Sequence, residues 1–273
     1  MSVKNILAAY SGQASKESAL KHAVKVAKLH DAWVTGVISH HGQPLAEERF
    51  GGRLPNSILE ELHELDRQRL KEIQDSFESI MHENGLGDRS DFMDIAQNEV
   101  TNLSAFARAF DLVVMGPHSN EPGESHISAH PDRVALESGR PVLIVPNGYK
   151  ADQLSDHALI AWDGKRSAAR ALGDAMNYLE TKPKVTILCV GKQATPGTDQ
   201  LLTSLARHNV ETNLLVKSPD FSIAKTILDT LNEVNAKLLI MGAYEHSKFA
   251  QDIFGGVTNE VMKDCNVPVF LSH

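Results

Sequence analysis

The sequence predicts an α/β protein with two doubly wound, five-stranded parallel sheets, one in each half of the chain. Two observations lead to this fold class. Short apolar runs alternate with segments of helical periodicity along all 273 residues, which is typical of βαβ units and parallel strands. The second half of the chain also repeats the order of elements, and several motifs, of the first half.

Internal similarity at a constant spacing identifies the repeat. The segment ILAAYSGQASKESALKHAVKVA near the start matches LIAWDGKRSAARALGDAMNYL, which aligns Gly12 with Gly164 at a spacing of 152 residues. A second block, DLVVMGPHS, matches KLLIMGAYEHS and aligns Gly116 with Gly242 at a spacing of 126. A third block, RPVLIVP, matches VPVFLSH. The spacing shrinks along the chain, so the second copy is shorter and lacks residues in its middle.

The first copy has nearly continuous apolar strands, as expected where helices cover both faces of a parallel sheet. We expect strands at 6–10, 32–39, 92–95, 112–115 and 142–145, and helices at 15–29, 57–82, 100–110 and 132–137. The helix at 57–82 has a broad apolar face rather than a coiled-coil seam, so we predict that it packs on the sheet. That face contains Ile58, Leu62, Leu65, Ile73, Phe77 and Ile80.

The second copy repeats this order. We expect strands at 158–162, 185–190, 213–216, 238–241 and 269–271, and helices at 167–179, 199–207, 223–234 and 257–263. A turn-rich stretch at 146–156 separates the copies, with Asn147-Gly148 as its clearest break. These boundaries predict a first domain at 1–147 and a second at 156–273.

Composition narrows the class of protein. The net charge of −8 and the pI near 5.9 argue against a nucleic-acid surface, which needs a basic stripe. No apolar run is long enough to cross a bilayer, and the N-terminus lacks the layout of a signal peptide. Two cysteines, Cys189 and Cys265, do not form a disulfide framework and are expected to be small core residues. We therefore expect a cytoplasmic protein with neither nucleic-acid nor membrane partners.

Several residues of the second copy fall where an open parallel sheet binds ligands, beyond the carboxyl ends of its strands. Asp163 follows the first strand, Gly242 follows the fourth, and Gly255, Gly256 and Thr258 begin the last helix. Glycines before a helix allow backbone N–H groups to approach an anion, and the helix N-terminus adds partial positive charge. An acidic side chain at a strand end can accept hydrogen bonds from a ribose or a base. The alternatives are that Asp163 caps the helix and that the glycine pair only begins one.

These segments resemble the universal stress protein family in its tandem two-domain form. Family members that bind ATP carry G-x2-G-x9-G-[S/T] after the fourth strand, and this chain reads GAYEHSKFAQDIFGG. Gly242 and Gly255 match the first and third glycines, whereas Glu245 replaces the second glycine and Gly256 the Ser or Thr. The resemblance implies an adenine nucleotide alpha-hydrolase-like fold, an adenine contact near Val190 and Gly191, and ATP, with Mg²⁺, as the possible cofactor.

The resemblance also implies an intrachain pseudo-dimer, because family dimers pair their fifth strands. Residues 142–145 are then expected to meet residues 269–271, and a further homodimer of chains is possible. The first copy departs from the binding motif, since Ser11 stands at the aspartate position and PHSNEPGESHISAHPDR replaces the glycine loop. We expect no nucleotide there. Its histidines, His118, His126 and His130, match no standard zinc spacing and are interpreted as exposed loop residues.

Three functions remain open. The first is a stress-response protein that binds an adenine nucleotide in its second copy. The second is a protein-interaction module in which both sites are degenerate. The third is an adenylating or ATP-hydrolysing enzyme. The sequence favours it least, because it has no general base and only a faint likeness of AAYSGQASKES to the loop of ATP pyrophosphatases.

Overall fold

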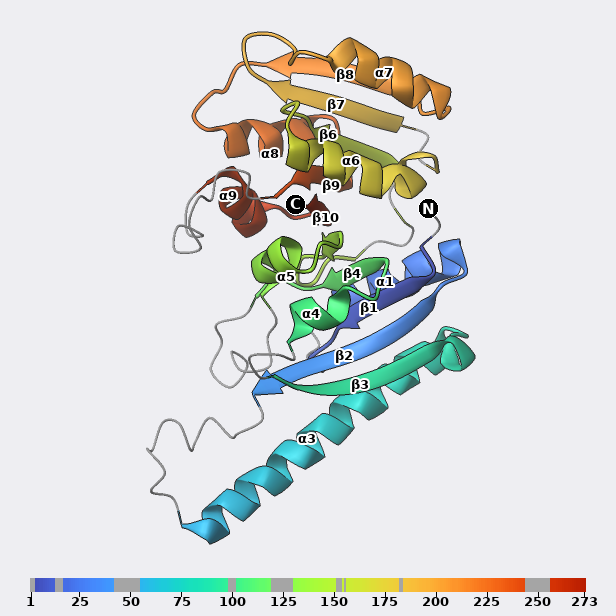
Figure 1. Cartoon of the computed structure of the whole chain (residues 1–273), viewed down its shortest axis with the longest axis vertical. Coiled ribbons are helices and arrows are strands. Elements are labelled where there is room, and N and C mark those ends of the chain that lie inside the picture. Colours follow the sequence, from blue (N-terminus) through green and yellow to red (C-terminus); the bar gives the residue numbers. More distant parts are fainter. Residues whose placement is uncertain are drawn as a thin grey trace.

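In the computed structural model of the chain, residues 3–12, 17–41, 55–97, 102–118, 130–150, 154, 156–181, 184–243 and 256–273 are described. Their strands form one sheet of ten in the order β3-β2-β1-β4-β5-β10-β9-β6-β7-β8 (Figure 1). The strands are β1 (Asn5–Ala9), β2 (Trp33–His41), β3 (Ser90–Gln97), β4 (Leu112–Met115), β5 (Val142–Ile144), β6 (His157–Ala161), β7 (Lys184–Val190), β8 (Thr212–Lys217), β9 (Leu238–Gly242) and β10 (Val269–Ser272). This parallel-dominated α/β sheet confirms the predicted fold class.

The two halves of the sheet have the same internal order, and they meet at their fifth strands. β5 and β10 pair antiparallel, with Val142 opposite Leu271 and Ile144 opposite Val269. The other described strand pairs are parallel. The expected contact between residues 142–145 and 269–271 is therefore confirmed, and it joins the two predicted sheets into one.

Helices cover both faces of this sheet. One face packs against α1 (Glu17–His30), α3 (Asn56–Glu83), α6 (Arg166–Leu179) and α7 (Thr198–Arg207). The other packs against α4 (Leu103–Ala107), α5 (Pro131–Glu137), α8 (Ile223–Glu233) and α9 (Val257–Asp264). A short 3-10 helix, η1 (Gly87–Arg89), precedes β3. Within the described residues, none of the helices is long and apolar enough to cross a membrane.

Both cores continue across the junction of the two halves. The ring of Tyr178 in α6 is 5.4 Å from that of His30 in α1 and 5.6 Å from that of Phe270 in β10. Tyr178 is completely buried, and burial raises the pKa of its phenol far above the usual value. The halves thus share packed side chains as well as hydrogen bonds, so the junction belongs to the hydrophobic core.

The long helix α3 departs from its predicted packing. Its buried residues, Ile73, Phe77 and Met81, all lie in its C-terminal half. Nearer the N-terminus, Ile58 is 42% exposed and Leu65 is 56% exposed. Figure 1 shows the reason, because this end of α3 extends past the edge of the sheet. The prediction that the entire apolar face packs on the sheet was therefore wrong for the N-terminal turns.

Candidate functional site

The structure brings the described site candidates to one edge of the second half-sheet. Asp163 follows β6, Val190 and Gly191 lie at the end of β7, and Gly242 ends β9. β6 lies between β7 and β9, so the strand order reverses at this point. Ligands of doubly wound folds bind at such switch points. Glu245 and Gly255 lie outside the described residues.

Asp163 closes a turn rather than capping the helix that follows it. Its Oδ1 accepts a hydrogen bond from the backbone N–H of Lys165 at 3.0 Å, and its Oδ2 is 3.8 Å from the Lys165 ammonium. The N-cap of α6 is Lys165 itself, so the capping interpretation of Asp163 was wrong. The carboxylate remains 52% exposed and can accept further hydrogen bonds from a ligand.

Two helix N-termini flank the switch point without a side-chain cap. Lys165 and Gly256 are the N-caps of α6 and α9, and neither has a side chain that accepts a hydrogen bond from the first turn of its helix. The helix dipole favours an anion at such ends. Lys165 and Arg166 add two cations at the start of α6. The electrostatics of this edge therefore suit a phosphate.

Gly256 gives the backbone a conformation that side chains exclude. Its φ is 134°, a region that is accessible essentially to glycine alone. Among the described residues, no heavy atom lies within 4 Å of a Cβ placed at this position. Thr258 is buried in the first turn of α9. Gly256 thus sets the entry of the chain into α9 with backbone angles that other residues do not adopt.

At Gly242, glycine is required by close packing rather than by the backbone angles. A Cβ on Gly242 would lie 2.5 Å from the backbone nitrogen of Ala168 and 2.5 Å from Oγ of Ser167. The glycine therefore allows the first turn of α6 to pack directly on the end of β9. Packing alone explains this first glycine of the motif, so its presence is no evidence for phosphate contact.

At the end of β7, backbone hydrogen bonding limits what a base could contact. The N–H of Gly191 donates to the carbonyl of Lys217 at 2.8 Å, which extends the ladder between β7 and β8. Val190 is half-buried beside it. A purine here would contact the Val190 side chain or a backbone oxygen rather than this N–H.

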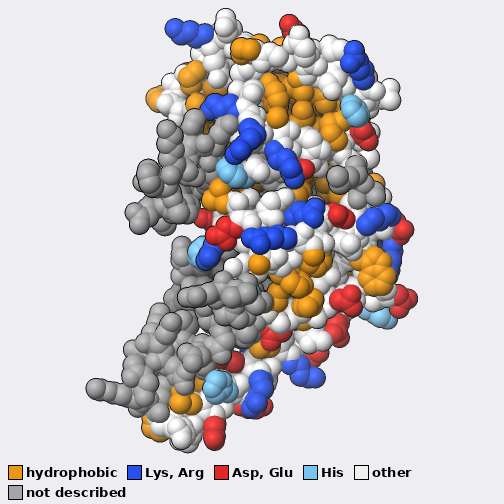
Figure 2. Space-filling view, in the orientation of Figure 1, with side chains coloured by type: hydrophobic (Ala, Val, Ile, Leu, Met, Phe, Trp, Pro, Cys, Tyr) orange, Lys and Arg blue, Asp and Glu red, His pale blue; other side chains and the backbone are white. Residues whose placement is uncertain are grey.

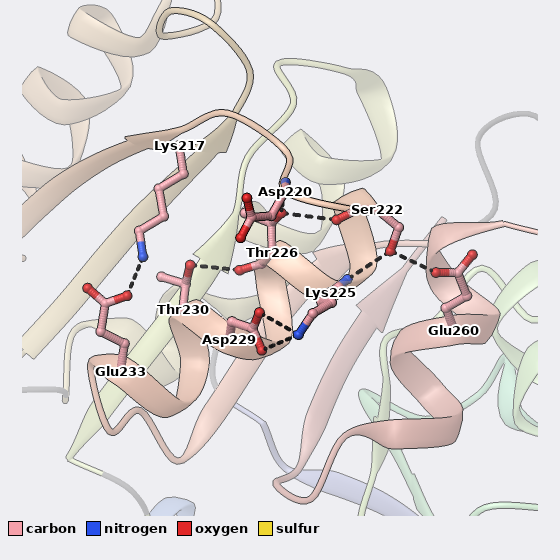
Figure 3. A network of polar contacts seen from close by, with 9 residues as sticks. All are labelled: Lys217, Asp220, Ser222, Lys225, Thr226, Asp229, Thr230, Glu233 and Glu260. Carbon is pink, nitrogen blue, oxygen red and sulfur yellow. Dashed lines mark hydrogen bonds and ion pairs between the residues drawn. The ribbon is translucent and has the colours of Figure 1, made fainter.

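A polar network that sequence reasoning missed fixes the position of α9 (Figure 3). Oγ of Ser222, the N-cap of α8, accepts from the Lys225 N–H and donates to the Glu260 carboxylate, both at 3.1 Å. Glu260 lies in the first turn of α9, so this bond ties the two helices together. The sequence signal was a serine directly before an apolar helix. The sequence contains no pattern that identifies Glu260 as the partner of Ser222.

The equivalent edge of the first half is built differently. Ser11, at the position of Asp163, is buried, and its hydroxyl has no hydrogen-bond partner among the described residues. A Cβ on Gly12 would lie 2.4 Å from Cγ1 of Ile73, because α3 packs against this loop. A buried hydroxyl and an abutting helix replace the exposed carboxylate of the second half.

Two of the predicted loop histidines in the first half contact each other. The rings of His118 and His130 stack with centroids 3.7 Å apart. Burial and the neighbouring His118 lower the pKa of His130. His130 is exposed, as predicted, whereas His118 is half-buried, and His126 lies outside the described residues. No cluster of three or more His, Cys, Asp or Glu side chains suited to a metal occurs within the described part of the chain.

Cys189 and Cys265 are free and buried, which confirms their prediction as core residues.

Comparison with known proteins agrees with this architecture. Residues 220–273 match the model of the universal stress protein family. Universal stress protein Slr1230 from Synechocystis sp. (strain PCC 6803) is 27% identical over 171 residues, which are 59% of this chain and 57% of that relative. The C-terminal part of the second half is thus similar to universal stress proteins. The match to this curated relative spans little more than half of the relative's own length.

Solved structures support the fold over the full chain. A universal stress protein from Archaeoglobus fulgidus DSM 4304 superposes with a TM-score of 0.70 at 18% identity, covering 100% of this chain and 96% of its own. A protein of unknown function from Pseudomonas aeruginosa PAO1 gives a TM-score of 0.58 at 14% identity, covering 99% and 92%. At such low identities the superpositions establish a shared fold, and this fold extends over the whole chain.

Proposed function

We propose that the protein is a stress-response protein that binds an adenine nucleotide, ATP taken with Mg²⁺, at the carboxyl edge of its second half-sheet. The observation that carries this proposal is the pair of helix N-termini at the switch point. α6 and α9 both begin there without a side-chain cap, next to an exposed carboxylate. Phosphates suit the helix ends, and a ribose or a base suits the carboxylate.

The residues divide into two groups in this proposal. Asp163 accepts hydrogen bonds from the ribose or base, and Val190 and Gly191 border the base. Gly255, Gly256 and Thr258 hold the phosphates, with Gly242 supporting the site through its packing on α6.

Glu245 stands at the second glycine position of the family motif, either as a solvated loop charge or as a carboxylate that opposes phosphate binding. A carboxylate close to the phosphates repels them unless a cation lies between the two. We expect Glu245→Gly to strengthen ATP binding by about tenfold, the effect of removing roughly 1.4 kcal/mol of repulsion. Glu245→Gln removes the charge but keeps the size of the side chain, so it should show most of the increase in ATP affinity expected for Glu245→Gly.

Nucleotide binding is tested directly on the full chain. The purified protein is denatured and its supernatant examined for adenine absorbance, and Mg-ATP is then titrated into the native protein by calorimetry. Asp163→Ala should weaken binding at least about tenfold, because it removes a charged hydrogen-bond acceptor. Asp229→Asn, an exposed aspartate paired with Lys225 on α8, is the matched control and should leave the affinity unchanged. Absence of both released nucleotide and binding heat would refute the proposal.

A protein-interaction module is the second candidate. Phe221 is 86% exposed directly before α8, beside Ile223, which is 44% exposed. Exposed aromatic side chains of this kind often anchor protein contacts. This function becomes the better one if calorimetry detects no nucleotide. Turnover of ATP well above background, lost in Asp163→Ala, would instead indicate an enzyme.

A further inference from the structure

The last strand of the sheet, β8, has one side of its backbone unpaired. The carbonyl of Lys217 accepts a hydrogen bond from the N–H of Gly191 at 2.8 Å, so the backbone groups of Lys217 point toward β7. The backbone groups of successive strand residues point to opposite sides, so those of Thr212, Leu214 and Val216 point away from β7. No described strand lies on that side, because β8 ends the sheet. These three residues therefore offer a free row of donors and acceptors.

The two ends of the sheet differ in how they are protected against pairing with another chain. At the other end, β3 carries Asp91 and Asp94, and α3 extends past it (Figure 1). Charges and covering elements of this kind prevent edge strands from pairing. Residues 212–216 of β8 include neither a charge nor a proline. Leu214 is half-buried and Val216 is 41% exposed, and Figure 2 shows apolar side chains gathered over the β7–β8 end of the molecule. β8 is therefore the edge that can accept a further strand.

We propose that β8 pairs antiparallel with β8 of a second copy of the same chain. Only residues whose backbone groups point outward can exchange hydrogen bonds across this contact. A single register pairs all three of them in both copies. In that register Leu214 lies opposite Leu214 of the other copy, and Thr212 lies opposite Val216. A two-fold axis beside Leu214 then makes the two halves of the contact equivalent, which closes the assembly as a dimer.

The charges at the two ends of β8 are complementary in this register, which was fixed by the hydrogen bonds alone. Glu211 lies directly opposite Lys217 of the other copy, and the two-fold axis repeats the pair. Residues of such a non-hydrogen-bonded pair have the closest side chains in an antiparallel ladder. Lys217 pairs with Glu233 of α8, so its ammonium lies on the α8 face of the sheet (Figure 3). Glu211 of the other copy points to the same face, which favours a second copy as the partner.

Sedimentation equilibrium of the full chain tests the contact. One pair of short strands buries less than the roughly 1,000 Å² of a stable interface, so a monomer–dimer equilibrium that depends on protein concentration is expected. Val216→Pro removes an N–H that points outward and leaves the ladder between β7 and β8 intact. It should weaken dimerisation by about tenfold or more, because the dimer loses one hydrogen bond on each side of the axis. Val216→Thr keeps the N–H and the branched shape, so this matched control should leave dimerisation unchanged.

Charge reversal tests the antiparallel arrangement. Glu211→Lys and Lys217→Glu should each weaken dimerisation, whereas a chain with both changes should dimerise like the natural chain. The two positions are about 20 Å apart along one strand, so they compensate each other only between chains. Glu233→Gln removes the same intrachain ion pair as Lys217→Glu and is its control, with dimerisation expected to stay the same. Circular dichroism and urea unfolding establish that each variant is folded.

Cross-linking measures the register independently. Under mild oxidation, Leu214→Cys chains should form a disulfide-linked dimer, because the Cα atoms of a hydrogen-bonded pair are about 5.5 Å apart. Val216→Cys chains should not, because their two copies of residue 216 lie about 13 Å apart along the strands. The native cysteines are buried.

Four results would overturn the proposal. They are a monomer at all concentrations, a dimer that Val216→Pro leaves intact, equal cross-linking of the two cysteine variants, and oligomers larger than a dimer. The last result would indicate that β8 pairs with β3 of the next chain, which leaves a free edge at each end and does not close.

Discussion

At the scale of single residues, three glycines of the second half occupy three different environments. Gly256 holds a φ of 134°, Gly242 makes room for the backbone of α6, and Gly173 is in the exposed middle of α6, with open space around a Cβ. Residue type alone cannot separate these cases. Measurements of stability can distinguish Gly242 from Gly173, because replacement by alanine should destabilise the protein at Gly242 and stabilise it at Gly173.

Gly242→Ala should lower the free energy of unfolding by about 2 to 3 kcal/mol, because its Cβ would press on backbone that cannot rotate away. Gly173→Ala should raise it by about 0.5 to 1 kcal/mol, the gain expected in a helix interior. Urea unfolding followed by circular dichroism measures both. If Gly242→Ala were neutral, the close contact between β9 and α6 would be wrong.

Tyr178 offers a second test with a matched partner. Its hydroxyl is buried without a hydrogen-bond partner among the described residues, whereas the Tyr10 hydroxyl is 2.9 Å from Oγ of Ser76. Tyr178→Phe should therefore raise the free energy of unfolding by about 1 kcal/mol, and Tyr10→Phe should lower it by about 1 kcal/mol. A loss of stability in Tyr178→Phe would mean that this hydroxyl is satisfied.

At the scale of elements, the helices and strands could be predicted to within a few residues, whereas their contacts could not. Apolar runs and helical periodicity are local properties, so β4 was predicted without error and α6 to within one residue. Periodicity also marked an apolar face on all of α3, but it does not record where the sheet beneath the helix ends. Similarly, the motif located Asp163, while its turn with Lys165 depends on backbone geometry at the start of α6.

The bond between α8 and α9 gives a prediction at this scale. Ser222→Ala removes both the cap of α8 and the link to Glu260, and it should cost about 1 kcal/mol of stability. Glu260→Ala removes only the exposed link and should cost about 0.5 kcal/mol or less.

A double-mutant cycle between Ser222 and Glu260 isolates the link from the cap. If the link positions α9 for phosphate binding, both single variants should also weaken nucleotide binding measured by calorimetry. Independent, additive effects of the two substitutions would show that the helices are not coupled through this pair.

At the scale of the whole molecule, pairing of β5 with β10 removes two sheet edges that two separate units would expose. The edges that remain are β3 and β8, at opposite ends of the sheet. Because the fifth strands are used within the chain, association between chains needs another surface, and β8 is the edge strand proposed for it. The nucleotide is proposed for the second half alone, so the two halves share an order of strands but not the proposed site.

The stability of the whole chain should fall on mild acidification. Burial lowers the pKa of His157 at the start of β6, with Lys184 as a further cause, and burial lowers that of His130 in the other half. Their unfolded pKa is 6.5, so below about that pH the unfolded chain binds more protons than the folded chain. The stability contributed by the neutral imidazoles is thus complete above pH 6.5 and is lost as the pH falls through the folded pKa values.

Urea unfolding between pH 7.5 and pH 5 measures this loss, and His157→Gln tests its origin. Glutamine can keep the hydrogen bond that the His157 ring makes with Oγ1 of Thr186 at 2.9 Å, but it cannot take up a proton in this range. The variant should therefore show a shallower dependence of the unfolding free energy on pH than the natural chain. An equal slope in both proteins would assign the acid sensitivity to other groups, and titration of the His157 ring by NMR would then give a pKa that is not lowered.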